Sequence, residues 1–426
     1  MGDLESLENG QTAAAPRPAT SNERIASLDF IRGIAVMGIL AANIVAFGQP
    51  FGAYMYPAGF LTEHGVTSDW LWAAQFVLVD GKMRGLFTLL FGAGMMLFME
   101  RAWARGATRW LQARRLFWLG VFGLVHFFFI WRGDILFYYA VIGLAVLLMV
   151  GWQAQTQLKV GIWGYLAGAF LYAVMMAPLP LVADTELGEQ ANFSEMRAEL
   201  EVAKQEALAD DVIETEIVQS GDYAGYVVHR FKEHGSEPLS NIALFFMETL
   251  PLMLIGMALY RMGLFSGEFD PGKQRRWGWT GVMVGGALHL IIALWAMAGG
   301  LTYYGTLAAF VGISPVPRLV MVLGLAALLS LYAPHATGWL GQRISAAGRA
   351  AFSNYLGTSI VMLFVFHGWA LGLFGRLDRP QLYLVVAVTW VLMLLWSKPW
   401  LDRFRYGPLE WLWRCLTYGR IFAMRR

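Results

Sequence analysis

The sequence reads LDFIRGIAVMGILAANIVAFG over residues 28–48, an apolar run that is interrupted by Asp29, Arg32 and Asn43. A helix crosses a bilayer with about 20 mostly apolar residues, so this run predicts a transmembrane helix. Nine more runs bring the expected total to about ten spans: 83–100, 115–131, 135–150, 159–182, 240–260, 277–299, 318–333, 350–374 and 381–397. A re-entrant or interfacial element over 300–317 leaves the expected count between nine and eleven.

The composition predicts the same class of protein. Hydrophobic residues make up 57% of the 426-residue chain and charged residues only 15%. Soluble domains carry about 25% charged residues, so this composition predicts an all-α, polytopic membrane bundle. The net charge of +2 does not point to a nucleic-acid partner. The single cysteine, Cys415, excludes an intramolecular disulfide and a multi-cysteine metal site, and we expect no bound metal.

The distribution of charge predicts the orientation of the chain. Basic residues mark the segments 101–115 and 261–276 and the tail after residue 397. The segment 183–239 instead contains 14 Asp and Glu residues and 4 Lys and Arg residues. Cytoplasmic loops carry the excess of Lys and Arg, so both termini are predicted to be cytoplasmic and 183–239 extracytoplasmic. Helical periodicity in this acidic insert predicts one or two exposed amphipathic helices.

The chain divides by composition into five parts: a disordered cytoplasmic tail at 1–23, an N-terminal membrane half of five helices at 24–182, the acidic insert at 183–239, a C-terminal membrane half at 240–397, and a basic and aromatic cytoplasmic tail at 398–426. Small residues recur within the apolar runs: Gly92 and Gly94, Gly164 and Gly168, Gly281 and Gly285. Small residues let membrane helices approach closely, so we assign these glycines to packing.

Polar side chains within the first predicted span need an explanation, because they are costly in lipid. Asp29 and Arg32 are three residues apart and can pair on one helix face. Asn43 lies eleven residues beyond Arg32, which returns it close to the same face. One interpretation is a structural ion pair with an interhelical amide hydrogen bond. The other is a polar stripe that lines a cavity through the bundle.

His126 lies near the outer end of the third predicted span, and Asp134 follows it across a short turn. A carboxylate that holds one ring nitrogen makes the other nitrogen more basic, as a general base requires. The alternative is an interhelical hydrogen bond without catalysis, or an interfacial pair of Asp134 with Arg132.

Three further residues are candidates for binding. Lys82 and Arg84 come just before the second span and predict either an outer binding edge for an anion or two snorkelling side chains. Glu248 lies three residues before Pro251 within a span, where a buried carboxylate beside a broken helix predicts a cavity. We expect His289 and His367 to be structural, and His64 to lie on the surface.

Two parts of the chain resemble the YeiB-type family of bacterial membrane proteins, which is defined by a domain of unknown function. The N-terminal resemblance covers RIASLDFIRGIAVMGILAANI, KMRGLFTLLFGAG and GLVHFFFIWRGDILFYYAVIGL. The C-terminal one covers GRAAFSNYLGTSIVMLFVFHGWALGLFGRLDRPQ and FRYGPLEWLWRCLTYGR. The first span is also similar to the wider transmembrane acyltransferase superfamily. In its polysaccharide branch this helix contains an arginine and, after ten intervening residues, a histidine. In this sequence Arg32 matches the arginine, but Asn43 stands where the branch has the histidine. Its heparan branch also has Asn at that place.

The resemblance implies a membrane acyltransferase located in the bacterial cytoplasmic (inner) membrane. It would move an acyl group from cytoplasmic acyl-CoA, such as acetyl-CoA, to an extracytoplasmic carbohydrate or another hydroxyl or amine. The implied roles are these: Asp29 and Arg32 hold the cytoplasmic mouth, Asn43 stabilises the oxyanion, His126 with Asp134 is the base, and Lys82 and Arg84 bind an anion outside. Expected partners are membrane lipids, the carbohydrate acceptor and, as an open alternative, a second copy of the chain in a homo-oligomer. A transporter or flippase and a non-catalytic scaffold are the alternative functions.

Overall fold

The computed structural model describes residues 25–426, so the predicted tail at 1–23 lies outside the described residues. Within the described part, the regular structure is helical apart from one isolated bridge between Phe404 and Arg425. The expected all-α, polytopic membrane architecture is confirmed.

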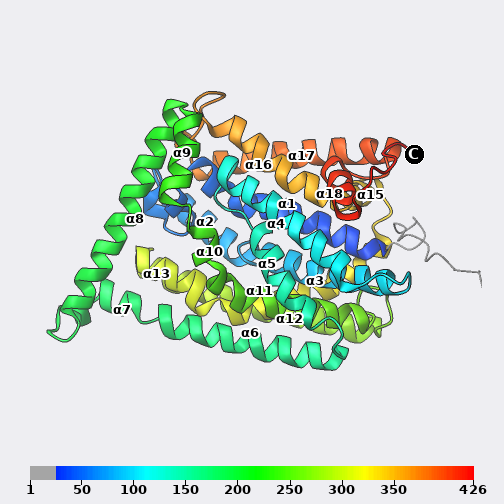
Figure 1. The fold of residues 1–426 in the computed structure, drawn as a ribbon. Coiled ribbons are helices and arrows are strands. Elements are labelled where there is room, and N and C mark those ends of the chain that lie inside the picture. The colour runs from blue at the N-terminus through cyan, green and yellow to red at the C-terminus, as the bar shows by residue number, and fades with distance from the viewer. Residues whose placement is uncertain (1–24) are drawn as a thin grey trace, which may run out of the picture.

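The long helices form one bundle with roughly parallel axes (Figure 1). Its members are α1 (Ala26–Gly48), α2 (Val66–Leu78), α3 (Lys82–Trp103), α4 (Arg109–Phe129), α5 (Leu136–Leu148), α6 (Ala154–Met176), α11 (Ile242–Arg261), α12 (Pro271–Ala298), α14 (Pro315–Tyr332), α16 (Ala351–Phe366) and α17 (Arg379–Arg403).

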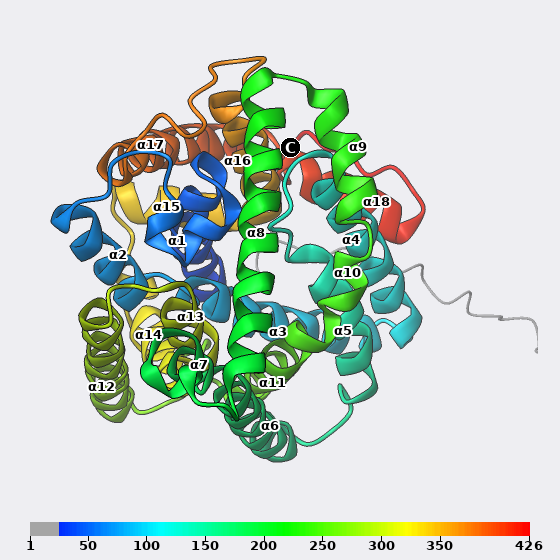
Figure 2. The same ribbon diagram turned by 90° about the vertical axis from the view of Figure 1, so that its left-hand side faces the viewer.

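The long α8 and several short helices close the two ends of the bundle. At one end, on the left of Figure 1, lie α7 (Leu179–Asp184), α8 (Ser194–Ser220), α9 (Tyr223–Glu233), α10 (Glu237–Ser240) and α13 (Tyr303–Leu307). At the other lie α15 (Trp339–Arg349) and α18 (Pro408–Tyr418). We call these the insert end and the C-terminal end. Figure 2 looks onto the insert end, where α8 runs across the bundle.

The number of membrane spans differs from the expected ten. Seven helical stretches are long and apolar enough to cross a membrane, or eight when α15 and α16, which meet at a bend of 86°, count as one span. Each of the ten predicted segments contains a helix, although in 350–374 the helix ends at Phe366, and two of the ten do not meet this criterion. α5 has only 13 residues, and α4 contains Arg114, Arg115 and His126, which lower its apolar character. The segment 300–317 forms α13 and a π-helical turn, Ala308–Ile313, before α14 begins.

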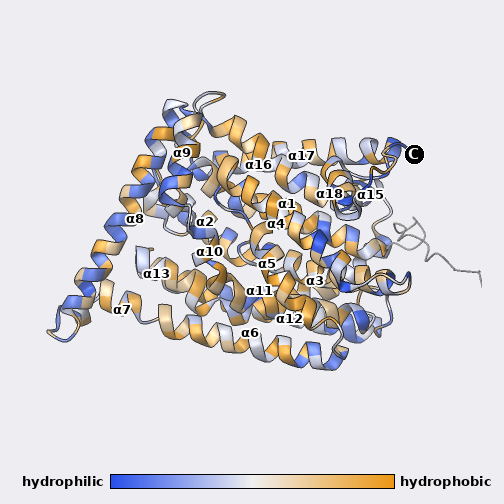
Figure 3. Cartoon of the chain, in the orientation of Figure 1, coloured by the Kyte–Doolittle hydropathy of each residue, from blue (hydrophilic) through white to orange (hydrophobic). Residues whose placement is uncertain are grey.

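Hydropathy separates the bundle from the insert. Apolar residues cover the bundle helices, whereas α8 is largely hydrophilic (Figure 3). Large apolar side chains on the outside of the bundle are exposed, for example Phe170 at 72% on α6 and Leu384 at 67% on α17. A soluble protein rarely exposes an apolar surface of this extent, so these faces are suited to contact with lipid.

Glycines set the closest helix contacts. On α12, a Cβ atom at Gly285 would lie 2.7 Å from the Met321 Cβ and 2.8 Å from the Pro317 carbonyl oxygen of α14. Such distances are too short for non-bonded atoms, so α14 can lie here only against a residue without a side chain. A Cβ atom at the neighbouring Gly286 would meet no other atom within 4 Å, because this residue faces away from α14.

This pair of glycines provides a matched test of the packing. We expect Gly285→Leu to destabilise the detergent-solubilised protein by about 1–3 kcal/mol, because the new side chain forces α12 and α14 apart. Gly286→Leu adds the same side chain one residue away and is expected to have no such cost. The midpoint of thermal unfolding of the two variants checks this, and equal midpoints would contradict the helix contact.

Candidate functional site

A buried histidine and aspartate form the centre of the candidate site. His126 lies in the last turn of α4, and its Nδ1 is 2.8 Å from the Asp134 Oδ1. The second carboxylate oxygen accepts a hydrogen bond of 2.8 Å from the Phe137 backbone N–H in the first turn of α5. Both side chains are excluded from solvent. The other ring nitrogen of His126, Nε2, is buried and has no hydrogen-bond partner among residues 25–426.

The sequence around His126 explains why the aspartate can reach it. Gly123 lies one turn before His126, and a Cβ atom there would be 2.8 Å from the Asp134 carboxylate and from the Phe137 Cα. The segment from Asp134 to Phe137 can therefore pack against α4 at position 123 only because Gly123 has no side chain. Trp131 fixes the turn, because its ring stacks on Phe47 of α1 with a centroid distance of 4.0 Å.

A cavity of about 340 Å³ opens at the C-terminal end of the bundle. Its lining combines cationic and apolar side chains. The cations are arginines from α1, α3, α4, α15 and α18 and from two loops: Arg32, Arg101, Arg105, Arg115, Arg349, Arg405 and Arg414. The acidic residues in the lining are two, Asp29 and Glu410. The surplus of guanidinium groups makes this cavity suited to an anionic ligand.

The inner wall of this C-terminal cavity is apolar and aromatic. Met95, Leu136 and Tyr139 contribute to it, together with Tyr355 of α16. The Tyr355 ring also packs edge-on against the imidazole of His126, with a centroid distance of 5.3 Å. Tyr355 therefore stands between the cavity and the His126–Asp134 pair.

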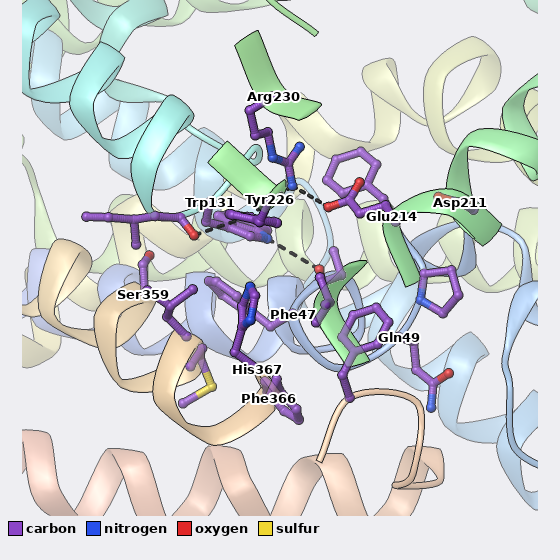
Figure 4. A pocket seen from close by; sticks show the side chains of 18 residues that line it. Phe47, Gln49, Trp131, Asp211, Glu214, Tyr226, Arg230, Ser359, Phe366 and His367 are labelled. Atoms are coloured by element: carbon purple, nitrogen blue, oxygen red, sulfur yellow. Dashed lines mark hydrogen bonds and ion pairs between the residues drawn. The ribbon is translucent and has the colours of Figure 1, made fainter. Parts of the chain in front are cut away.

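A second, smaller cavity of about 40 Å³ approaches the same pair from the insert end. Figure 4 shows Trp131, Tyr226 and His367 around it. The ring of Trp131 lies 6.2 Å from that of His126, measured between centroids. α16 contributes to both cavities, since Tyr355 lines the larger one and Ser359 the smaller one. The His126–Asp134 pair thus lies between two cavities that open toward opposite ends.

The smaller cavity contains polar atoms without partners. The Arg230 side chain donates hydrogen bonds to Glu214 and to the Tyr226 hydroxyl, and it is 1% exposed. Its Nε and Nη1 are buried without hydrogen-bond partners among the described residues, as are both ring nitrogens of His367. We expected His367 to be structural, and its position beside Arg230 makes it a polar wall of this cavity.

The first span contributes only part of the expected polar stripe. Asp29 and Arg32 pair at 3.1 Å, as expected, and line the C-terminal cavity. Asn43 is half-buried and lines neither cavity. The residues between them on this helix face, Val36 and Ile39, belong to the apolar core. The cavity therefore ends before it reaches Asn43.

The remaining predicted binding residues point into the protein. The Lys82 ammonium is 1% exposed and donates to the Phe76 carbonyl oxygen. Arg84 pairs with Glu248, and Arg318 of α14 donates to both Glu248 carboxylate oxygens at 3.1 Å. The Glu248 carboxylate is thus held by two guanidinium groups. Lys82 is thus buried, and Arg84, whose side chain is 25% exposed, is paired with Glu248.

Sequence reasoning missed three residues of these sites. Arg318 and Tyr355 lie in runs that show no polar pattern around them. Glu410 accepts hydrogen bonds from the Phe352 and Ser353 backbone N–H groups at 2.8 and 3.0 Å, which caps the first turn of α16. Burial raises the pKa of Glu410, and these hydrogen bonds oppose that rise.

Comparisons with known proteins give relatives over nearly the whole chain. Residues 259–420 match the family model described as "Protein of unknown function (DUF418)". The chain is 31% identical to the uncharacterised protein YeiB of Escherichia coli, covering 93% of this chain and 96% of the relative. It is 30% identical to the uncharacterised protein YxaH of Bacillus subtilis, over 94% and 96% of the two chains. No solved structure matches the chain.

The Glu248 ion pairs give a stability prediction. Glu248→Ala leaves the buried Arg318 and the partly exposed Arg84 without their carboxylate, and we expect a loss of about 3–5 kcal/mol in the free energy of unfolding. Glu100→Ala is the control, because the Glu100 side chain is 41% exposed, lies 4.0 Å from Arg261 and, among residues 25–426, accepts only one hydrogen bond, from the Tyr260 hydroxyl. We expect that change to cost about 1 kcal/mol or less. Unfolding in detergent measures both, and equal losses would contradict a central role for Glu248.

Proposed function

Because this chain belongs to the YeiB-type family of bacterial membrane proteins, we propose that it is a membrane-bound acyltransferase whose base is the buried His126–Asp134 pair. The donor would be a cytoplasmic acyl-CoA, and the acceptor an extracytoplasmic carbohydrate or another hydroxyl or amine. One observation carries this proposal. The imidazole with a free Nε2 lies between an arginine-lined cavity at one end of the bundle and a polar cavity at the other.

The donor side is supported by the chemistry of the C-terminal cavity. Coenzyme A combines phosphate groups with a long, weakly polar arm that ends in the thioester. Arginine is the preferred partner of phosphate, because its planar group donates two parallel hydrogen bonds. In the proposal, the guanidinium groups near the helix ends bind the phosphates, and the arm extends along Met95 and Tyr139 to Tyr355.

The proposed reaction is a direct transfer. His126 Nε2 takes the proton from the acceptor hydroxyl or amine, whose oxygen or nitrogen attacks the thioester carbonyl carbon. The new C–O or C–N bond forms, the C–S bond breaks, and the imidazolium returns the proton to the leaving thiolate. Asp134 holds the ring by Nδ1 and stabilises the transient imidazolium. We assign the oxyanion donor to the Tyr355 hydroxyl in place of Asn43, because Tyr355 contacts both the cavity and His126.

The acceptor would approach from the insert end. The smaller cavity offers the aromatic rings of Trp131 and Tyr226 with polar groups of Arg230 and His367. Rings with nearby hydrogen-bond donors suit a sugar, which has apolar faces and a polar edge. A volume of about 40 Å³ is too small for a whole sugar, which would enter only when α8 and α9 move outward.

The first test replaces the proposed base. The purified full chain, incubated with labelled acetyl-CoA and candidate acceptors, is expected to release labelled product or to hydrolyse the thioester. His126→Ala should lower that rate by about 10²–10⁴-fold, because general-base catalysis typically contributes this much. Asp134→Asn should lower it as well, because the imidazolium loses its carboxylate.

His289→Ala is the matched control for this test. His289 is as buried as His126, but its Nδ1 bonds to the Gly285 carbonyl oxygen on α12, away from both cavities. We expect this variant to keep the parent rate. Full transfer by His126→Ala would overturn the assignment. Coenzyme A binding without any turnover by the parent protein, combined with uptake of a solute into vesicles, would favour the transporter alternative.

A second test concerns the donor cavity. Arg32→Gln should weaken coenzyme A binding, measured by calorimetry on the detergent-solubilised protein, because it removes one guanidinium from the cavity lining. Arg275→Gln is the control, since it removes the same charge from an exposed position at the start of α12. The affinity of the parent should also fall as salt rises, because charge pairs are screened. Equal affinities of the two variants would contradict a binding role of this cavity.

A further inference from the structure

The acidic insert contains a cluster of two histidines and an aspartate that the proposed reaction does not use. Asp210 lies on α8, His229 on α9, and His234 directly after α9. These helices lie next to each other across the insert end (Figure 2). One ligand-type atom from each of the three residues lies within 4.8 Å of the other two.

The distances in this cluster differ from those of hydrogen bonds. The Asp210 Oδ1 lies 3.5 Å from His229 Nε2 and 3.3 Å from His234 Nε2. Hydrogen bonds between nitrogen and oxygen measure about 2.7–3.2 Å. Ligand atoms at 2.0–2.1 Å from a tetrahedral zinc ion are roughly 3.3–3.4 Å apart. The two separations from the Asp210 Oδ1 therefore match those of ligands around a shared ion, and the three ligand-type atoms all lie within 4.8 Å of one another.

The two imidazoles also lack other partners on the converging side. Both Nε2 atoms are buried and have no hydrogen-bond partner among the described residues. The side chains are well enclosed, with 10% exposed for His229 and 6% for His234. Buried polar atoms are normally paired, so two such nitrogens directed at one carboxylate oxygen indicate a missing ligand.

Groups behind the cluster orient it as metal sites are commonly oriented. The Glu237 carboxylate lies 2.8 Å from His234 Nδ1, which leaves Nε2 as the ring atom with a free lone pair. Arg132, from the turn between α4 and α5, donates to Asp210 Oδ2 at 3.2 Å. The Asp210 Oδ2 thus accepts from the Arg132 guanidinium, and the Asp210 Oδ1 faces the two histidines.

We propose that Asp210, His229 and His234 bind one divalent transition-metal ion, with Zn²⁺ as the preferred ion and a water molecule as its fourth ligand. Neutral imidazole nitrogens with one carboxylate oxygen form a ligand set that suits this ion. The site lies outside the spans, so the ion enters from solvent. It joins α8 to the end of α9 next to Arg230, so that the two helices would move as one unit above the smaller cavity.

The experiment uses the full chain in detergent, purified without a polyhistidine tag and treated with a chelator. Co²⁺ is the probe, because its tetrahedral complexes absorb visible light. We expect one Co²⁺ per chain with a tetrahedral spectrum that Zn²⁺ abolishes by displacement, and a rise in the unfolding temperature with Zn²⁺. His229→Ala and His234→Ala should each remove the spectrum and the thermal shift. Glu237→Gln should weaken binding by about 10–100-fold, as the loss of an orienting partner does.

His64→Ala is the matched control, because His64 also pairs with one aspartate, at 2.7 Å from Asp69, without a third ligand. It should bind Co²⁺ like the parent. Each variant is first checked for the parent's size-exclusion profile and helical signal, so that misfolding is recognised. The absence of a stoichiometric tetrahedral spectrum in the parent would overturn the proposal and leave an ion-paired network. An unchanged spectrum in the folded His229 and His234 variants would also overturn it. Neither result depends on acyl transfer.

Discussion

One carboxylate links four helices of the bundle. Glu248 of α11 accepts hydrogen bonds from Arg84 of α3, Arg318 of α14 and Tyr165 of α6. An apolar interior offers no water to such charges, so each must face a partner of opposite sign. The need to satisfy these groups together fixes α3 against α11. Because α3 also forms one wall of the C-terminal cavity, through Phe91 and its neighbours, this ion-pair cluster indirectly determines the shape of the proposed donor site.

The arrangement around His126 separates two requirements of the proposed acyl transfer. A donor with several negative charges needs cations, whereas the reacting centre needs a site without bulk water. The arginines lie at the helix ends and the imidazole lies behind the ring of Tyr355. The aromatic rings on both sides of His126 therefore keep the polar cavities apart. In the proposal, movement of these rings connects the cavities only when both substrates are bound.

Local relations were predictable from the sequence, and distant ones were not. Asp29 and Arg32 are three residues apart on one helix, and His126 meets Asp134 across a short turn, so spacing alone predicted both contacts. The partners of Glu248 are 164 and 70 residues away in the chain. No periodicity encodes such separations, because packing of whole helices decides them.

The same limit explains the differences in the fold. Apolar runs located every predicted span as a helix, since the cost of exposing peptide groups in lipid imposes helix on each run. They did not determine how deep the polar stripe of α1 extends, because that depends on whether neighbouring helices fill the face at Val36 and Ile39. The arginines of the larger cavity come mostly from helix ends, loops and short helices at the C-terminal end. Their positive charge indicated a side of the membrane but not a shared cavity.

The length of α5 has a consequence for the turn that precedes it. Its 13 residues rise only about 20 Å, whereas the hydrocarbon layer is about 30 Å thick. A helix of this length does not cross the layer by itself, and most of α5 is buried among other helices, so the protein must cover the polar turn that precedes it. Arg132 in that turn is bound by Asp210, Glu214 and Glu237 of the insert. The insert therefore covers the charged turn before α5 and supplies its guanidinium with carboxylate partners, so that lipid does not have to solvate this turn.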